Sequence, residues 1–100
     1  MADSQSSLKE RTRVSIQEPK RYNAILHNDD FTTMEFVVLV LKTVFRQSEE
    51  AAQMLMMKVH KEGKAIAGTY SYDIAVSKAM KAKRMAREEG FPLNITVEEA

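Results

Sequence analysis

Three consecutive polar residues, Asn28, Asp29 and Asp30, stand directly before the most apolar segment of the chain, residues 36–41. Their side chains offer an amide oxygen and two carboxylates as hydrogen-bond acceptors. If a helix begins just after them, they lie beside its positive end, where carboxylates are favoured. Such a cluster is suited to binding a cation. Taken alone, it is more typical of a turn that leads into a helix.

A capping pattern predicts where that helix begins. Thr32 and Glu35 have the spacing of a capping box, in which the threonine hydroxyl accepts from the amide of Glu35 and the glutamate accepts from the amide of Thr32. The apolar residues predicted to share one face of this helix are Met34, Val37, Leu41, Val44 and Phe45.

A second helix is predicted to begin at Ser48 and to end at Gly63. Its apolar stripe comprises Ala51, Ala52, Leu55, Met56 and Val59. His60 falls at the edge of this stripe, one turn beyond Met56, where histidine commonly interacts with the negative end of a helix.

The remaining elements complete a small α+β domain. Alternating residues predict strands over 22–27 and 64–70, and Gly68 in the latter indicates a bulge or a close approach of another backbone. A third helix is predicted from Ser71 to about Glu89, with a buried side formed by Ile74, Ala75, Ala79, Ala82, Met85 and Ala86. Leu93, Ile95 and Val97 alternate as a last strand. The order β-α-α-β-α-β predicts three helices packed on a small three-stranded antiparallel sheet.

Residues 1–20 are predicted to form a disordered N-terminal arm, and residues 21–100 the folded domain. Beyond its first two residues the arm has only Leu8, Val14 and Ile16 as aliphatics. That apolar area is too small to offset backbone ordering at about 1 to 2 kcal/mol per residue.

Composition limits the class of protein. A chain of 100 residues with 44% hydrophobic residues fits one small domain with a thin core. The absence of cysteine excludes a disulfide scaffold and cysteine metal sites. The polar start has no apolar run, so we expect no signal peptide, no membrane partner and a cytoplasmic location. A net charge of +1 gives no reason to expect a nucleic-acid partner.

Three segments match a known family in order and spacing. They are YNAILHNDDFTTMEFVVLVLKTVF, MMKVHKEGKAIAG and FPLNITVEE, which together cover Tyr22 to Glu99. They resemble the ClpS adaptor family, whose members recognise destabilising N-terminal residues on proteins and hand those proteins to a Clp ATPase for degradation. The resemblance implies a bacterial N-end rule adaptor that is not an enzyme and uses no cofactor or metal, and we expect a monomer.

The resemblance also implies roles for particular residues. A substrate's α-amino group is held by Asn28, Asp29, Asp30 and His60. Its first side chain, that of Leu, Phe, Tyr or Trp, enters a pocket matching Thr32, Met34, Val37, Met56, Val59 and Leu93. Docking to the N-terminal domain of the ATPase is expected at Asp73 and Lys78. The chemistry is consistent, because a carboxylate, an amide oxygen and a neutral imidazole can meet all three donors of an ammonium group.

Two positions depart from the family pattern. Thr33 stands where the family usually has proline, as the first helical residue after the predicted cap, and we expect it to loosen the start of the helix. Val76 stands where the family has glutamate, which leaves the identity of the ATPase partner open. Lys78 falls inside the apolar stripe of its helix, so its side chain either extends past Ala82 and Met85 to solvent or reaches a partner's carboxylate.

Two other functions were considered. A basic helix bearing Lys78, Lys81, Lys83, Arg84 and Arg87 suggests a nucleic-acid or ribosome-associated module, but three acidic residues share that helix and no aromatic residue lies among the basic ones. A metal hydrolase could use His27, Asp29, Asp30 and His60, yet the paired histidine spacing of a zinc site is missing. A peptide site explains the same residues more simply.

Overall fold

The computed structural model describes residues 19–100. Six elements follow one another in this range: β1 (Tyr22–His27), α2 (Met34–Thr43), α3 (Glu49–Glu62), β2 (Lys64–Tyr70), α4 (Tyr72–Glu88) and β3 (Asn94–Glu99). β1 is the central strand of an antiparallel sheet with the order β2-β1-β3. The predicted fold class and order of elements are confirmed. The predicted arm over 1–20 lies outside the described residues except for Pro19 and Lys20.

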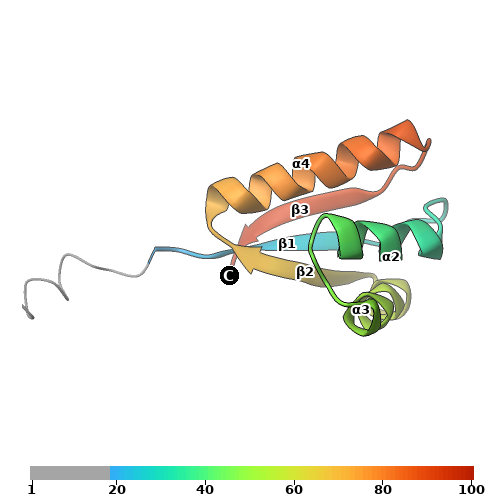
Figure 1. Cartoon of the computed structure of the whole chain (residues 1–100), viewed down its shortest axis with the longest axis horizontal. Coiled ribbons are helices and arrows are strands. Elements are labelled where there is room, and N and C mark those ends of the chain that lie inside the picture. Colours follow the sequence, from blue (N-terminus) through green and yellow to red (C-terminus); the bar gives the residue numbers. More distant parts are fainter. Residues whose placement is uncertain (1–18) are drawn as a thin grey trace, which may run out of the picture.

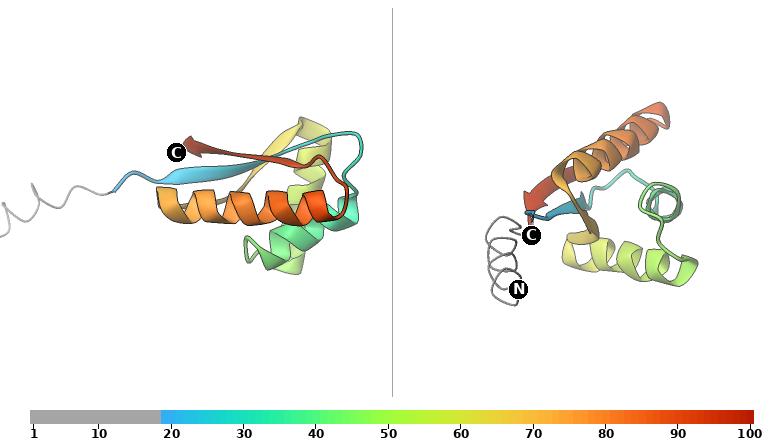
Figure 2. Two further views of the ribbon diagram at one scale, coloured as in Figure 1. Left: turned by 90° about the horizontal axis from the view of Figure 1, so that it is seen from above. Right: turned by 60° about the vertical axis from the view of Figure 1, so that its left-hand side comes forward.

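The helices cover one face of the sheet, with α4 along β3 and α3 beside β2 (Figures 1 and 2). Because side chains alternate along a strand, Ala24 and Leu26 of β1 face the helices and are fully buried, while Ile25 faces the other side. One core cluster joins the inner face of the sheet to all three helices. None of the helices formed by residues 19–100 is long and apolar enough to cross a membrane.

The bulge predicted at Gly68 is present in β2. Ala24 pairs with Gly68 and Ile25 with Ile66, so Ala67 is the extra residue. Glycine is needed at this position because the Cβ of any other residue would overlap the Tyr70 hydroxyl group. The Tyr70 ring therefore packs directly over the glycine backbone.

The predicted capping box at Thr32 and Glu35 is wrong by one residue. Thr33 is the N-cap of α2, and its side chain accepts a hydrogen bond of 3.2 Å from the amide of Phe36. The Thr32 hydroxyl instead donates to Asp29, because a charged acceptor forms the stronger hydrogen bond. Thr33 therefore fixes the start of the helix and does not loosen it. Glu35 is left outside any capping interaction.

Two residues predicted for buried helix faces are exposed. Met34 is 43% exposed at the start of α2, whose buried residues are Phe36, Val37, Val40 and Leu41. Ile74 is 49% exposed, because α4 packs through its stripe of alanines, Ala75, Ala79, Ala82 and Ala86. Small side chains let this helix lie close to the sheet, which leaves the larger Ile74 outside the contact.

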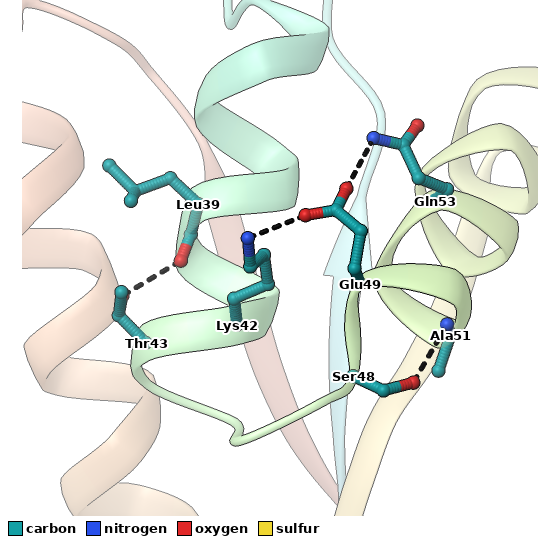
Figure 3. A network of polar contacts seen from close by, with 7 residues as sticks. All are labelled: Leu39, Lys42, Thr43, Ser48, Glu49, Ala51 and Gln53. Atoms are coloured by element: carbon teal, nitrogen blue, oxygen red, sulfur yellow. Dashed lines mark hydrogen bonds and ion pairs between the residues drawn. The ribbon is translucent and has the colours of Figure 1, made fainter.

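A polar network fixes α2 against α3 (Figure 3). Glu49, the first residue of α3, accepts hydrogen bonds from Lys42 of α2 and from the Gln53 side chain. Ser48 is the N-cap predicted for α3, and its side chain accepts from the amide of Ala51. At the other end, Gly63 adopts the left-handed conformation (φ 92°) that a glycine C-cap uses. The predicted ends of α3 are confirmed.

Lys78 connects α4 to the end of α2. Its Nζ donates a 2.7 Å hydrogen bond to the carbonyl oxygen of Val44 and lies 5.3 Å from the centre of the Tyr70 ring. A cation at the C-terminal end of a helix is favoured by the helix dipole. The ammonium group thus has an intramolecular partner, an arrangement that differs from both of the sequence-based alternatives for this residue.

Candidate functional site

Asp29 organises the loop between β1 and α2. Its Oδ1 accepts hydrogen bonds from the amides of Phe31 (2.8 Å) and Thr32 (2.7 Å), and its Oδ2 accepts from the Thr32 hydroxyl (2.7 Å). An aspartate that bonds its own downstream backbone in this way sets a tight turn. Both carboxylate oxygens of Asp29 are therefore used to hold the loop.

The pKa of Asp29 reflects this role. Partial burial raises the pKa, but the hydrogen bonds from Thr32 and Phe31 and the positive charge of Arg87 outweigh it, so that the pKa lies below the ordinary 3.8. The loop is consequently held by an ionised carboxylate throughout the neutral range.

A backbone hydrogen bond brings the loop to the end of α3. The amide of Asn28 donates to the carbonyl oxygen of Gly63 over 2.8 Å. Gly63 caps α3, and His60 lies in the last turn of that helix. This bond therefore places the side chains of Asn28 and His60, 32 positions apart in the sequence, at one site.

A cavity of about 250 Å³ lies where the loop, the start of α2 and the second half of α3 meet. Val37, Met56 and Val59 are buried and form its apolar part, while Met34 is exposed at its edge. The residues that line it are Asn28, Asp29, Asp30, Thr32, Met34, Val37, Met56, Val59 and His60. The cavity thus has a polar end and an apolar end.

The structure brings together nine of the ten residues that the family resemblance assigned to peptide binding. Leu93 is the exception: it is 1% exposed, belongs to the core cluster and does not line the cavity. Asp73 and Lys78, assigned to ATPase docking, lie on α4 outside the cavity. His27 is also outside it, because its Nε2 pairs with the Thr96 hydroxyl at 2.7 Å on the sheet.

The polar end of the cavity can bind a cationic group. The carboxylate of Asp29 already accepts hydrogen bonds from the loop. In contrast, the side chains of Asn28, Asp30 and His60 form no hydrogen bond with any part of the chain that the structure describes. These three side chains supply an amide oxygen, a carboxylate and, when neutral, an imidazole nitrogen. A larger hollow of about 440 Å³ on α3 also has acceptors, in Gln53 and Glu62, but Lys58 and Lys61 line it too, so it carries no net negative charge for a cation.

Arg87 supports the site from α4, which the sequence did not reveal. Its Nη1 donates to the carbonyl oxygens of Phe91 (2.8 Å) and Leu93 (3.0 Å), and its charge helps to lower the pKa of Asp29. In the sequence, Arg87 was only one of several basic residues on a helix. With Arg87 and Lys78 both donating to backbone carbonyls, the face suggested for nucleic acid loses two of its five cations to internal contacts.

The comparisons with known proteins agree on one family. The model of the ATP-dependent Clp protease adaptor protein ClpS matches residues 17–96. The ATP-dependent Clp protease adapter protein ClpS of Desulforapulum autotrophicum is 44% identical over 102 aligned positions, which cover 98% of each chain. The adapter protein ClpS 2 of Rhizobium meliloti is 45% identical, covering 98% of this chain and 97% of its own.

A solved structure shows the same fold. It is Agrobacterium tumefaciens ClpS2 bound to L-phenylalaninamide, which superposes with a TM-score of 0.80 at 44% sequence identity. The match covers 83% of this chain and the whole of that one.

Proposed function

The chain belongs to the ClpS family of ATP-dependent Clp protease adaptors, and on this premise we propose that its cavity binds the N-terminal residue of proteins destined for a Clp protease. The proposed ligand is a free α-amino group together with a bulky hydrophobic first side chain. The protein then delivers its substrate to the Clp ATPase. In this role it is an adaptor and catalyses no reaction itself.

The observation that carries this proposal is that one cavity has both a polar end and an apolar end. An α-ammonium group has three N–H donors and a charge, which must be matched if it is removed from water. The side chains of Asn28, Asp30 and His60 can meet these donors. The first side chain of the substrate then extends over Val37, Met56 and Val59, which are already buried from water.

The four residues expected to hold the α-amino group divide into two roles. Asn28, Asp30 and His60 are proposed to bind it directly. Asp29 is proposed to act as a positioning residue, because three hydrogen bonds from Phe31 and Thr32 occupy its carboxylate. The ligand of the Agrobacterium relative supports the assignment, since L-phenylalaninamide carries a free α-amino group next to a benzyl side chain.

Titration with short peptides that differ only in their first residue tests the proposal. Burial of a Leu or Phe side chain contributes about 1.5 to 3 kcal/mol, so peptides that begin with Leu, Phe, Tyr or Trp should bind roughly tenfold to a hundredfold tighter than one that begins with Ser. Equal affinity for all first residues would show that the cavity does not hold the first side chain.

Docking to the ATPase is proposed at the start of α4, where Asp73 is exposed in the first turn. Lys78 lies five residues further along α4 and is bonded to Val44, so its replacement changes stability as well as any docking. We expect Lys78→Met to lower the melting temperature by several degrees, because a charge-assisted hydrogen bond of about 1.5 to 3 kcal/mol is lost. Asp73→Asn should lower the melting temperature less, because an exposed carboxylate in the first turn of a helix contributes only about 0.3 to 1 kcal/mol.

Binding to the N-terminal domain of a Clp ATPase, measured for both variants beside their thermal unfolding, separates these effects. Asp73→Asn should weaken ATPase binding while peptide affinity stays at the wild-type value. Wild-type ATPase affinity in this variant would remove Asp73 from the docking surface. An unchanged melting temperature in Lys78→Met would contradict the structural role of its bond to Val44.

A further inference from the structure

A second cavity adjoins the proposed peptide site, in the groove between α2 and α3. It measures about 230 Å³ and is lined by Met34, Glu35, Val38, Gln53 and Met56. Met34 and Met56 also line the first cavity, so the two spaces share these side chains as a common wall.

The second cavity carries one uncompensated negative charge. Within residues 19–100 no lysine, arginine or histidine forms an ion pair with Glu35, and Thr33 rather than Glu35 provides the cap of α2. The neighbouring charges neutralise each other, because Lys42 is paired with Glu49. Glu35 is therefore the only charged residue of the lining, and it is available to a ligand.

Gln53 adds a hydrogen-bond acceptor. Its Nε2 donates to Glu49 Oε2 over 2.9 Å, and its amide oxygen points away from this contact (Figure 3). The rest of the lining is apolar, since it consists of Val38 and the two shared methionines. A carboxylate and an amide oxygen above an apolar floor suit a long basic side chain, whose methylenes lie on the floor and whose charged end meets the acceptors.

We propose that this second cavity binds the third side chain of the substrate and favours lysine or arginine there. The inference rests on the proposed function of the first cavity. In an extended peptide successive side chains point to opposite sides, so the first and third point the same way at a spacing of about 6.6 Å. Two neighbouring cavities with a shared wall match this arrangement, whereas the second side chain points away from the surface.

Peptides that keep phenylalanine first and vary only the third residue test the proposal. Exposed charge pairs contribute up to about 1 kcal/mol each, so a peptide Phe-Ala-Lys should bind roughly fivefold tighter than Phe-Ala-Glu at low ionic strength. The ratio should fall as salt is added. Moving the same lysine and glutamate to the second position should give a smaller ratio.

Two single-charge variants identify the residue responsible. Glu35→Gln should abolish the preference for lysine. Glu50→Gln is the matched control, because Glu50 occupies the same second helical position in α3, is exposed, and lines neither cavity. It should retain the wild-type ratio.

Equal affinity for the two third residues, a stronger preference at the second position, or an unchanged ratio in Glu35→Gln would each overturn the proposal. If instead the first cavity does not bind the first side chain of the peptide, a different result is expected. In that case replacing phenylalanine by serine at the first position would leave affinity unchanged, whatever the third residue is.

Discussion

Asp30→Asn is expected to lower the affinity for a peptide with a free N-terminal phenylalanine by roughly tenfold to a hundredfold. Asp30 carries the one carboxylate of the cavity that the loop does not use, and a hydrogen bond to a charged group contributes about 1.5 to 3 kcal/mol. Asparagine has nearly the same shape, so the change removes the charge and leaves the cavity intact. Isothermal titration calorimetry measures the loss.

Asp29→Asn is the matched control for Asp30→Asn. Asparagine keeps an oxygen that can accept from the amides of Phe31 and Thr32, and its amide can donate to the Thr32 hydroxyl. If Asp29 only positions the loop, this variant should bind within about threefold of wild type, a change below about 1 kcal/mol. Equal losses in the two variants would mean that both carboxylates contact the ammonium group, contrary to the division of roles proposed above.

Asp29→Ala should be far more damaging than Asp29→Asn, because it removes all three hydrogen bonds that shape the loop. Asn28 and Asp30 flank this residue and depend on the loop for their position. We expect peptide affinity to fall by at least about tenfold, since a displacement of either acceptor breaks a charge-assisted hydrogen bond. Wild-type affinity in Asp29→Ala would show that the loop holds its shape without this carboxylate.

Asp29 should also make stability depend on acid pH. Because its pKa is lowered by folding, its contribution is fully present above the ordinary 3.8 and is lost as the pH falls through the lower folded-state value. The side chain is only partly buried, so the contribution is below about 1 kcal/mol. Urea unfolding of wild type and Asp29→Ala should therefore show a stability difference near neutral pH that shrinks below 3.8. A constant difference would contradict the lowered pKa.

Much of the fold follows from local signals in the sequence. Ser48 and Gly63 delimit α3 as predicted, because a serine N-cap and a left-handed glycine C-cap act within a few residues of themselves. The start of α2 was misplaced because two adjacent threonines compete for one cap. Asp29 decides the competition by binding Thr32, and the capping pattern takes no account of that acceptor.

The site itself was only partly predictable. The family resemblance identified the acceptors and the apolar wall, but not which acceptor binds the ligand and which one holds the loop. Asp29 and Asp30 are identical in type, and only the geometry of the loop separates the one that holds it from the one that faces the cavity. The positions of Leu93 and Arg87 relative to the site depend on tertiary contacts between α4, β3 and the loop. A short-range sequence pattern cannot predict such contacts.

The most direct test of the central claim uses one peptide in two forms. The wild-type protein is titrated with a short peptide that begins with phenylalanine, once with a free α-amino group and once N-acetylated. Acetylation leaves the side chain unchanged but removes the charge and two of the three donors that Asn28, Asp30 and His60 are proposed to meet. We predict that the free peptide binds with a Kd on the order of micromolar and the acetylated one at least about a hundredfold more weakly. Equal affinity of the two forms would contradict the assignment of this cavity to a protein N-terminus.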